Sequence, residues 1–283
     1  MDKKFVFPFW APLLNFEMED TKVELTGNIL IRELTDYEKK PPNLLVERWP
    51  GLGYEKFALQ CSIIKPDPEP EPGFYLNDGK TCLENVLTLL RLFKEEVVGF
   101  NLIVQPLCSA PSYGMTAEHL KHYQLWLPKQ FKEKYKLLKN ETGELQAFFV
   151  DFWRRDFQAF SLALDYFNKS YIEPYIRDSL LDLVICLENL YLRKEEPELK
   201  AYKLRLRASY ILSTRFEERK NVFEDLKDAY NLRSNIVHGD KIPVVDYPFL
   251  FKIRNYARES IKKFLKEPSL ANSNVLDEIV LRG

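Results

Sequence analysis

After Gly143 the sequence changes from mixed segments to a series of long helical patterns with short connections. In each pattern apolar residues recur at the spacing of one helix face, and the nearly unbroken apolar run 180–192 is the strongest. Pro174, Pro197 and Gly239 lie where helix starts and stops are expected. The predicted helices are 144–167, 173–192, 198–212, 217–238 and 249–265, with a short amphipathic end at 275–281.

The first part of the chain carries strand patterns instead. Apolar and β-branched runs occur at 23–26, 29–31, 57–64 and 97–107, and one helical pattern covers 81–93. The run 66–73 holds four prolines and is expected to be an extended connection. We therefore predict an α+β protein. A mixed, β-containing domain over 1–143 would sense or position something, and an all-α helical bundle would follow over 144–283.

Charge and hydropathy limit the possible partners. The 283 residues carry a formal net charge of −1, which disfavours extended nucleic-acid binding but allows brief contact with a short single strand. No apolar stretch is long enough to cross a bilayer, and the amino terminus lacks the pattern of a signal peptide. We therefore expect a cytoplasmic protein that makes no contact with membranes.

Metal and cofactor chemistry finds no support in the motifs. The four cysteines are widely spaced, and Cys61 and Cys186 are expected to be small buried hydrophobes. His119 and His122 form an HxxH that no further ligand completes. Glycine-rich phosphate loops and the GxSxG motif are absent from the sequence. We predict no metal and no cofactor.

The lysine- and aromatic-rich run 129–139 is expected to be a solvated amphipathic helix, with RNA contact as the alternative.

Arg233 interrupts the apolar stripe of the fourth long helix. The stripe runs through Val222, Leu226, Ala229 and Tyr230. Arg233 returns to nearly the azimuth of Val222 at about 100° per residue. Burying a guanidinium is costly unless it is paired or faces a wet cleft. Glu188 is one candidate partner because it interrupts the apolar run 180–192.

Glu198 and Arg207, on the third helix, are further candidates for the same polar network. Geometry alone favours a structural ion pair for Arg233 over a catalytic role.

His238 lies five residues after Arg233, just before Gly239. On one continuous helix the two side chains would point about 140° apart and lie about 7.5 Å apart along the axis. Convergence therefore requires a helix break near His238 or a second subunit across a two-fold axis. The imidazole could act as a general acid or base near neutral pH, and the guanidinium could bind a phosphoryl oxygen.

The sequence DAYNLRSNIVHG over 228–239 resembles the RxxxxH signature of HEPN domains, most closely their ApeA-like branch. The segment 186–192 is similar to the LExLf helix of that branch, and 198–208 resembles the helix that follows it. The segments 34–39 and 89–93 of the amino-terminal half are also similar.

The resemblance implies a homodimer through the helical domain and metal-independent cleavage of RNA. The products would carry 2′,3′-cyclic phosphate and 5′-hydroxyl ends. His238 would be the acid/base, Arg233 would stabilise the transition state, and Ser234 and Asn235 would orient the phosphate or the imidazole. Many active relatives have Asn, Asp or His directly after the arginine, where this chain has Ser234.

ApeA-like proteins often belong to prokaryotic antiviral defence or toxin systems, with a phage or partner-protein trigger as a possible activator. The alternative hypothesis is a non-catalytic dimerisation, nucleotide- or RNA-binding module in which Arg233 and His238 are structural. A third hypothesis is an antitoxin-like partner of another enzyme.

Overall fold

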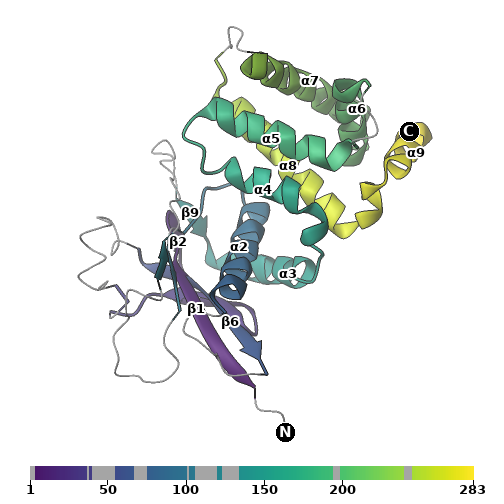
Figure 1. Cartoon of the computed structure of the whole chain (residues 1–283). Coiled ribbons are helices and arrows are strands. Elements are labelled where there is room, and N and C mark those ends of the chain that lie inside the picture. Colours follow the sequence, from purple (N-terminus) through teal and green to yellow (C-terminus); the bar gives the residue numbers. More distant parts are fainter. Residues whose placement is uncertain are drawn as a thin grey trace. The chain divides into compact units, whose positions relative to one another are not determined.

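The computed structural model describes residues 4–36, 38–39, 55–66, 75–100, 102–105, 120–122, 134–193, 198–238 and 244–283 (Figure 1). The fold is α+β, as predicted: an antiparallel sheet comes first and a largely helical region follows. Two compact units divide the chain. The first carries the sheet and ends at Trp153, and the second covers Arg154–Gly283. Among the described residues, no helix combines the length and the apolar character needed to cross a bilayer.

The main sheet has six strands, in the order β3-β4-β6-β1-β7-β8. Neighbouring strands pair antiparallel throughout. The predicted strands at 23–26, 29–31 and 57–64 are confirmed. Of the strand expected at 97–107, residues 102–104 form β7, while residues 101, 106 and 107 lie outside the described part of the chain. The strands are β3 (Lys22–Thr26), β4 (Ile29–Glu33), β6 (Phe57–Lys65), β1 (Phe5–Pro12), β7 (Leu102–Val104) and β8 (Leu120–His122).

Strand β1 lies inside the sheet although it contains Pro8. A proline removes one backbone donor and is normally confined to sheet edges or strand starts. Here β1 pairs with β6 along its whole length, with Pro8 opposite Ser62. On its other side the described pairing with β7 is limited to Trp10 and Val104. Pro8 therefore lies where β1 behaves locally as an edge strand.

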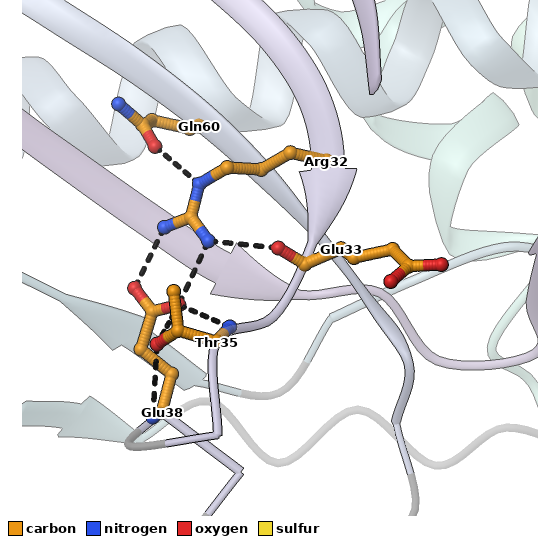
Figure 2. Close-up of polar contacts among 5 residues, drawn as sticks. All are labelled: Arg32, Glu33, Thr35, Glu38 and Gln60. Atoms are coloured by element: carbon orange, nitrogen blue, oxygen red, sulfur yellow. Dashed lines mark hydrogen bonds and ion pairs between the residues drawn. The ribbon is translucent and has the colours of Figure 1, made fainter. Parts of the chain in front are cut away.

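A polar cluster ties the segment after β4 back to the sheet (Figure 2). Both terminal nitrogens of Arg32 donate to the carboxylate of Glu38 at 2.7 Å, and its Nε donates to Gln60 on β6 at 2.6 Å. Thr35 donates to Glu38 from its backbone nitrogen and its hydroxyl, both at 2.9 Å. The amide of Glu38 donates back to the Thr35 hydroxyl at 3.3 Å. This reciprocal pair has the hydrogen bonds of a capping box.

Helices α2 (Leu76–Phe93) and α3 (Thr142–Phe152) belong to the sheet unit. Gln146 of α3 donates to the Glu24 carbonyl of β3 at 2.8 Å. The boundary between the units therefore follows α3, whereas 143 was the expected limit.

The single helix predicted over 144–167 is wrong. The chain leaves the helix after Phe152 and forms the short turn η3 (Gln158–Phe160) before α4 (Ser161–Lys169). Asp156 accepts the amides of Gln158 and Ala159 at 2.9 and 3.2 Å, which starts a new helical turn.

The amphipathic helix expected over 129–139 is also wrong for its described residues. Strand β9 (Tyr135–Leu137) pairs in parallel with β2 (Phe16–Met18). The ring of Tyr135 stacks on Phe16 with centroids 5.4 Å apart, and its hydroxyl donates to the Leu90 carbonyl at 3.1 Å. Burial of this tyrosine against α2 overrides the helical pattern, because the lysines that surround it can remain in water.

The second unit is a bundle of helices whose limits match the predictions closely. Helices α4 and α5 pack together, as do α6 and α7, and α8 packs against α5 (Figure 1). Asp246 caps α8 by accepting the Phe249 amide at 2.9 Å. The remaining helices are α5 (Ile176–Tyr191), α6 (Lys200–Leu212), α7 (Phe216–His238), α8 (Tyr247–Lys266) and α9 (Ser273–Arg282).

Candidate functional site around Arg233

Helix α7 buries one face in its middle part, and its end is more open. Val222, Leu226 and Ala229 face the core at 5%, 1% and 0% exposure. Beyond them Arg233 is half-buried, and Val237 and His238 are exposed. The stripe that the sequence predicts is therefore real, and Arg233 lies where the stripe approaches the surface.

Glu188 of α5 faces Arg233 of α7. The Nη2 of Arg233 lies 3.8 Å from the Oε2 of Glu188, and the two side chains are 28% and 20% exposed. The pairing is long for an ion pair, so it lacks the geometry of a bidentate Arg–carboxylate contact. In addition, the Nε of Arg233 is buried with no hydrogen-bond partner in the described part of the chain. The guanidinium thus retains hydrogen-bonding capacity for another group.

Tyr230 is a further member of this site, whereas the sequence placed it only on the apolar stripe of the helix. Its ring centroid lies 5.9 Å from the Arg233 guanidinium carbon, and its hydroxyl is near enough to Glu188 to feel the charge of that carboxylate. Burial and then the Glu188 charge raise the pKa of Tyr230, against a smaller opposing effect of Arg233. The available signal was its position, three residues before Arg233 on the same helix face.

His238 does not meet Arg233 within one chain. Helix α7 continues through Arg233 to His238, its last described residue. The helix therefore shows no break between them, and the side chains point about 140° apart. Ser234 and Asn235 are half-buried in the turns between them. Arg233 and His238 could meet only through a helix break or through a second copy of the chain. Because the described helix is unbroken, the second copy is the route that remains.

Arg207 holds a different part of the bundle. Its Nε and Nη2 donate to the two carboxylate oxygens of Asp277 on α9 at 2.8 and 3.0 Å, and its Nη1 donates to the Tyr191 carbonyl at 2.8 Å. These bonds join α6 to α9 and to the end of α5, which gives Arg207 a structural role. Glu198 is exposed just before α6.

The described residues hold no group of three or more histidine, cysteine, aspartate or glutamate side chains that could bind a metal. The sequence also contains the pair His119 and His122. His122 lies in β8, whereas His119 lies outside the described residues.

Comparison with protein-family models, curated proteins and solved structures finds no significant match to this chain. The HEPN resemblance therefore rests on the residues quoted above.

Proposed function

We propose that this protein is a HEPN-type, metal-independent endoribonuclease whose site forms between two copies of the helical unit. The observation that carries the proposal is the state of Arg233. Its guanidinium is partly exposed, has one long ion pair with Glu188, and keeps a buried Nε without a partner among the described residues. Five residues later, the exposed His238 lies at the end of the same helix.

The two-copy arrangement follows from helix geometry. Because Arg233 and His238 diverge on one helix, Arg233 of one copy would act with His238 of the second. A two-fold axis near the end of α7 would produce two such pairs. The exposed Val237 would be covered in the same interface.

The proposed reaction is an internal transfer at phosphorus. The ribose 2′-oxygen attacks the adjacent phosphorus, His238 accepts the 2′-hydroxyl proton, and the bond from phosphorus to the 5′-oxygen breaks. An imidazolium returns a proton to that leaving oxygen. Arg233 donates to the phosphoryl oxygens as negative charge builds up in the transition state. The products are a 2′,3′-cyclic phosphate and a 5′-hydroxyl.

The near-neutral chain favours a short single-stranded RNA as substrate, engaged transiently. From the resemblance we further propose a role in prokaryotic antiviral defence or a toxin system, in the cytoplasm. The sheet unit would then bind the phage component or partner protein that triggers cleavage.

The direct test is incubation of the purified protein with mixed RNAs in EDTA. We expect the wild-type protein to leave 2′,3′-cyclic phosphate ends, and His238→Ala to lose cleavage by roughly 100-fold or more, in line with the loss of a general acid/base. Analytical ultracentrifugation should show the same oligomeric state for both proteins. Undiminished cleavage by the His238→Ala variant would reject the assignment.

A mixing experiment tests the two-copy site. Arg233→Ala and His238→Ala chains are each expected to be inactive, whereas their mixed dimer would contain one intact pair and one doubly altered pair. Each mixed dimer should therefore have about half of the wild-type activity. Because random exchange of equal amounts makes about half of the dimers mixed, the whole mixture should recover about a quarter of the wild-type activity. A matched control mixes His238→Ala with the Arg233→Ala/His238→Ala chain, in which no intact pair can form. No recovery in a mixture that demonstrably contains mixed dimers would contradict the two-copy arrangement.

The alternative is a non-catalytic module in which the Arg233–Glu188 ion pair only stabilises the bundle. The ion pair itself favours it. A partly exposed pair of this length contributes about 0–1 kcal/mol. Under this alternative, Arg233→Ala would lower stability by that amount, and wild-type protein would leave every RNA intact.

A further inference from the structure

Helix α2 contacts strands β1 and β6 at Gly79. Phe9 of β1 pairs with Cys61 of β6 in the antiparallel ladder, so the two side chains share one face of the sheet. A Cβ placed on Gly79 would lie 2.4 Å from the Phe9 ring, closer than any side chain could tolerate. The missing side chain of Gly79 therefore lets the helix backbone come directly onto the sheet.

Two thiols meet at this point of close approach. The Sγ of Cys61 is fully buried and lies 3.8 Å from the Gly79 carbonyl oxygen. Cys82 lies three residues after Gly79, on the same side of α2, and its thiol is close enough to that of Cys61 to perturb it. Both cysteines are reduced, and Cys82 is partly exposed. Cys82 is thus the partly exposed member of the pair, and Cys61 is the buried member.

We infer that Cys61 and Cys82 are a reversible disulfide site that fastens α2 to β6 when the protein meets a low-molecular-weight disulfide. The Cys82 thiolate attacks one sulfur of the small disulfide and releases the other half as a thiolate. The Cys61 sulfur then attacks the Cys82 sulfur, passes its proton to water, and displaces the second half. The protein dithiol loses two electrons and two protons, and the small disulfide becomes two thiols.

The environments of the cysteines set the order of these steps. The hydrogen bond with Cys82, followed by burial, raises the pKa of the Cys61 thiol far above its ordinary range. Cys61 is therefore a poor first nucleophile. Once Cys82 is part of a mixed disulfide, the largest cause of the raised Cys61 pKa is gone, so Cys61 can act as the resolving thiol. Cys186 on α5 is also fully buried, and burial raises the pKa of its thiol, so we expect it to stay unreacted in the natural chain.

The test treats the folded, full-length protein with oxidised glutathione and measures its mass. In a Cys108→Ser/Cys186→Ala background only the pair remains. We expect a product lighter by two hydrogen atoms, with no free thiol left to alkylate, which dithiothreitol reverses. Adding Cys61→Ser should instead stop the reaction at a single glutathione adduct on Cys82. Should the background fail to fold, peptide mapping of the natural chain without reductant is expected to find the 61–82 crosslink.

Three results would overturn the inference. These are a lasting glutathione adduct on Cys82 while Cys61 is present, full alkylation of both thiols after treatment, and a crosslink between two chains. None of these outcomes depends on RNA cleavage, so the disulfide site and the proposed ribonuclease activity stand or fall separately.

Discussion

Arg233 forms a longer polar contact than two other arginines inside the helical unit. Arg207 donates to Asp277 at 2.8 and 3.0 Å, and Arg254 donates to the Ser170 carbonyl at 2.9 Å while its guanidinium lies 4.4 Å from the Tyr171 ring centroid. The Arg233 contact with Glu188 is 3.8 Å long. A guanidinium that only stabilised the bundle would be expected to form closer contacts, which is why we favour an anion-binding role.

At the residue scale, Glu38 makes part of the stability of the sheet unit depend on pH. Burial acts to raise its pKa, but hydrogen bonds from Arg32 and Thr35 outweigh burial and hold the pKa below the ordinary value of 4.5. A carboxyl group with a lowered pKa stabilises the folded state above its unfolded pKa. That contribution is lost as the pH falls below 4.5 through the folded pKa.

We therefore expect the midpoint of urea unfolding to fall between about pH 5 and pH 3, and to fall less in Glu38→Gln, which has no charge to lose. Asp36→Asn is a matched control, because Asp36 is an exposed neighbour with a loose 3.6 Å contact to Lys39. Equal acid sensitivity of Glu38→Gln and wild type would show that the Arg32–Glu38 pair contributes no pH dependence.

Part of the candidate site could be predicted at this scale. The helical period places Arg233 on the stripe, and the single carboxylate within the run 183–192 points to Glu188. Tyr230 was predicted on the apolar stripe, but its place beside Glu188 could not be predicted, because it depends on how α5 and α7 pack together. Arg207 was expected in the polar network of Arg233, but in the structure it forms an ion pair with Asp277 of the last helix.

At the element scale, one charged side chain and one apolar side chain of α9 attach it to the bundle. Arg207 is 1% exposed and Asp277 is 53% exposed, so the aspartate brings its charge from solvent to a buried guanidinium. Leu276 beside it is fully buried. The end of the chain, expected only to be amphipathic, is therefore a packed helix.

Arg207→Ala is expected to lower the free energy of unfolding by about 2–3 kcal/mol. The change leaves the Tyr191 carbonyl without this donor and removes the anchor of α9. Denaturant unfolding measures the effect, and hydrogen exchange should show faster exchange in α9. Asp277→Asn is the matched control and should cost about 1 kcal/mol or less, because its carboxylate is half exposed. A stable Arg207→Ala variant with protected α9 amides would contradict this role.

At the scale of the whole molecule, the chain forms two compact units that meet along the sequence between Trp153 and Arg154. Each unit has buried apolar residues of its own. Phe9, Ile31 and Leu59 are examples in the first unit, and Leu183 and Ile253 are examples in the second. Independent cores of this kind are the physical basis of separate folding.

We predict that a fragment covering 154–283 folds alone. Circular dichroism should show a helical spectrum, and thermal unfolding should be cooperative. If the proposed ribonuclease site lies wholly in this unit, the fragment should also cleave RNA in EDTA. A fragment that unfolds without a cooperative transition would mean that the helical unit depends on the sheet unit. The longer fragment 144–283, which adds most of α3, is the matched control and should gain no stability, because α3 packs on the sheet.

The α+β class, three strands, and the extents of the helices beyond 173 follow from the sequence alone, because their apolar periods are long enough to define which face is buried. Tertiary structure decided the rest. The break after Phe152, the strand at Tyr135–Leu137 and the pairing of Arg207 with Asp277 each depend on a partner distant in sequence or on a local cap. A local pattern records which side of a segment is apolar, but it does not record which distant surface that side will meet.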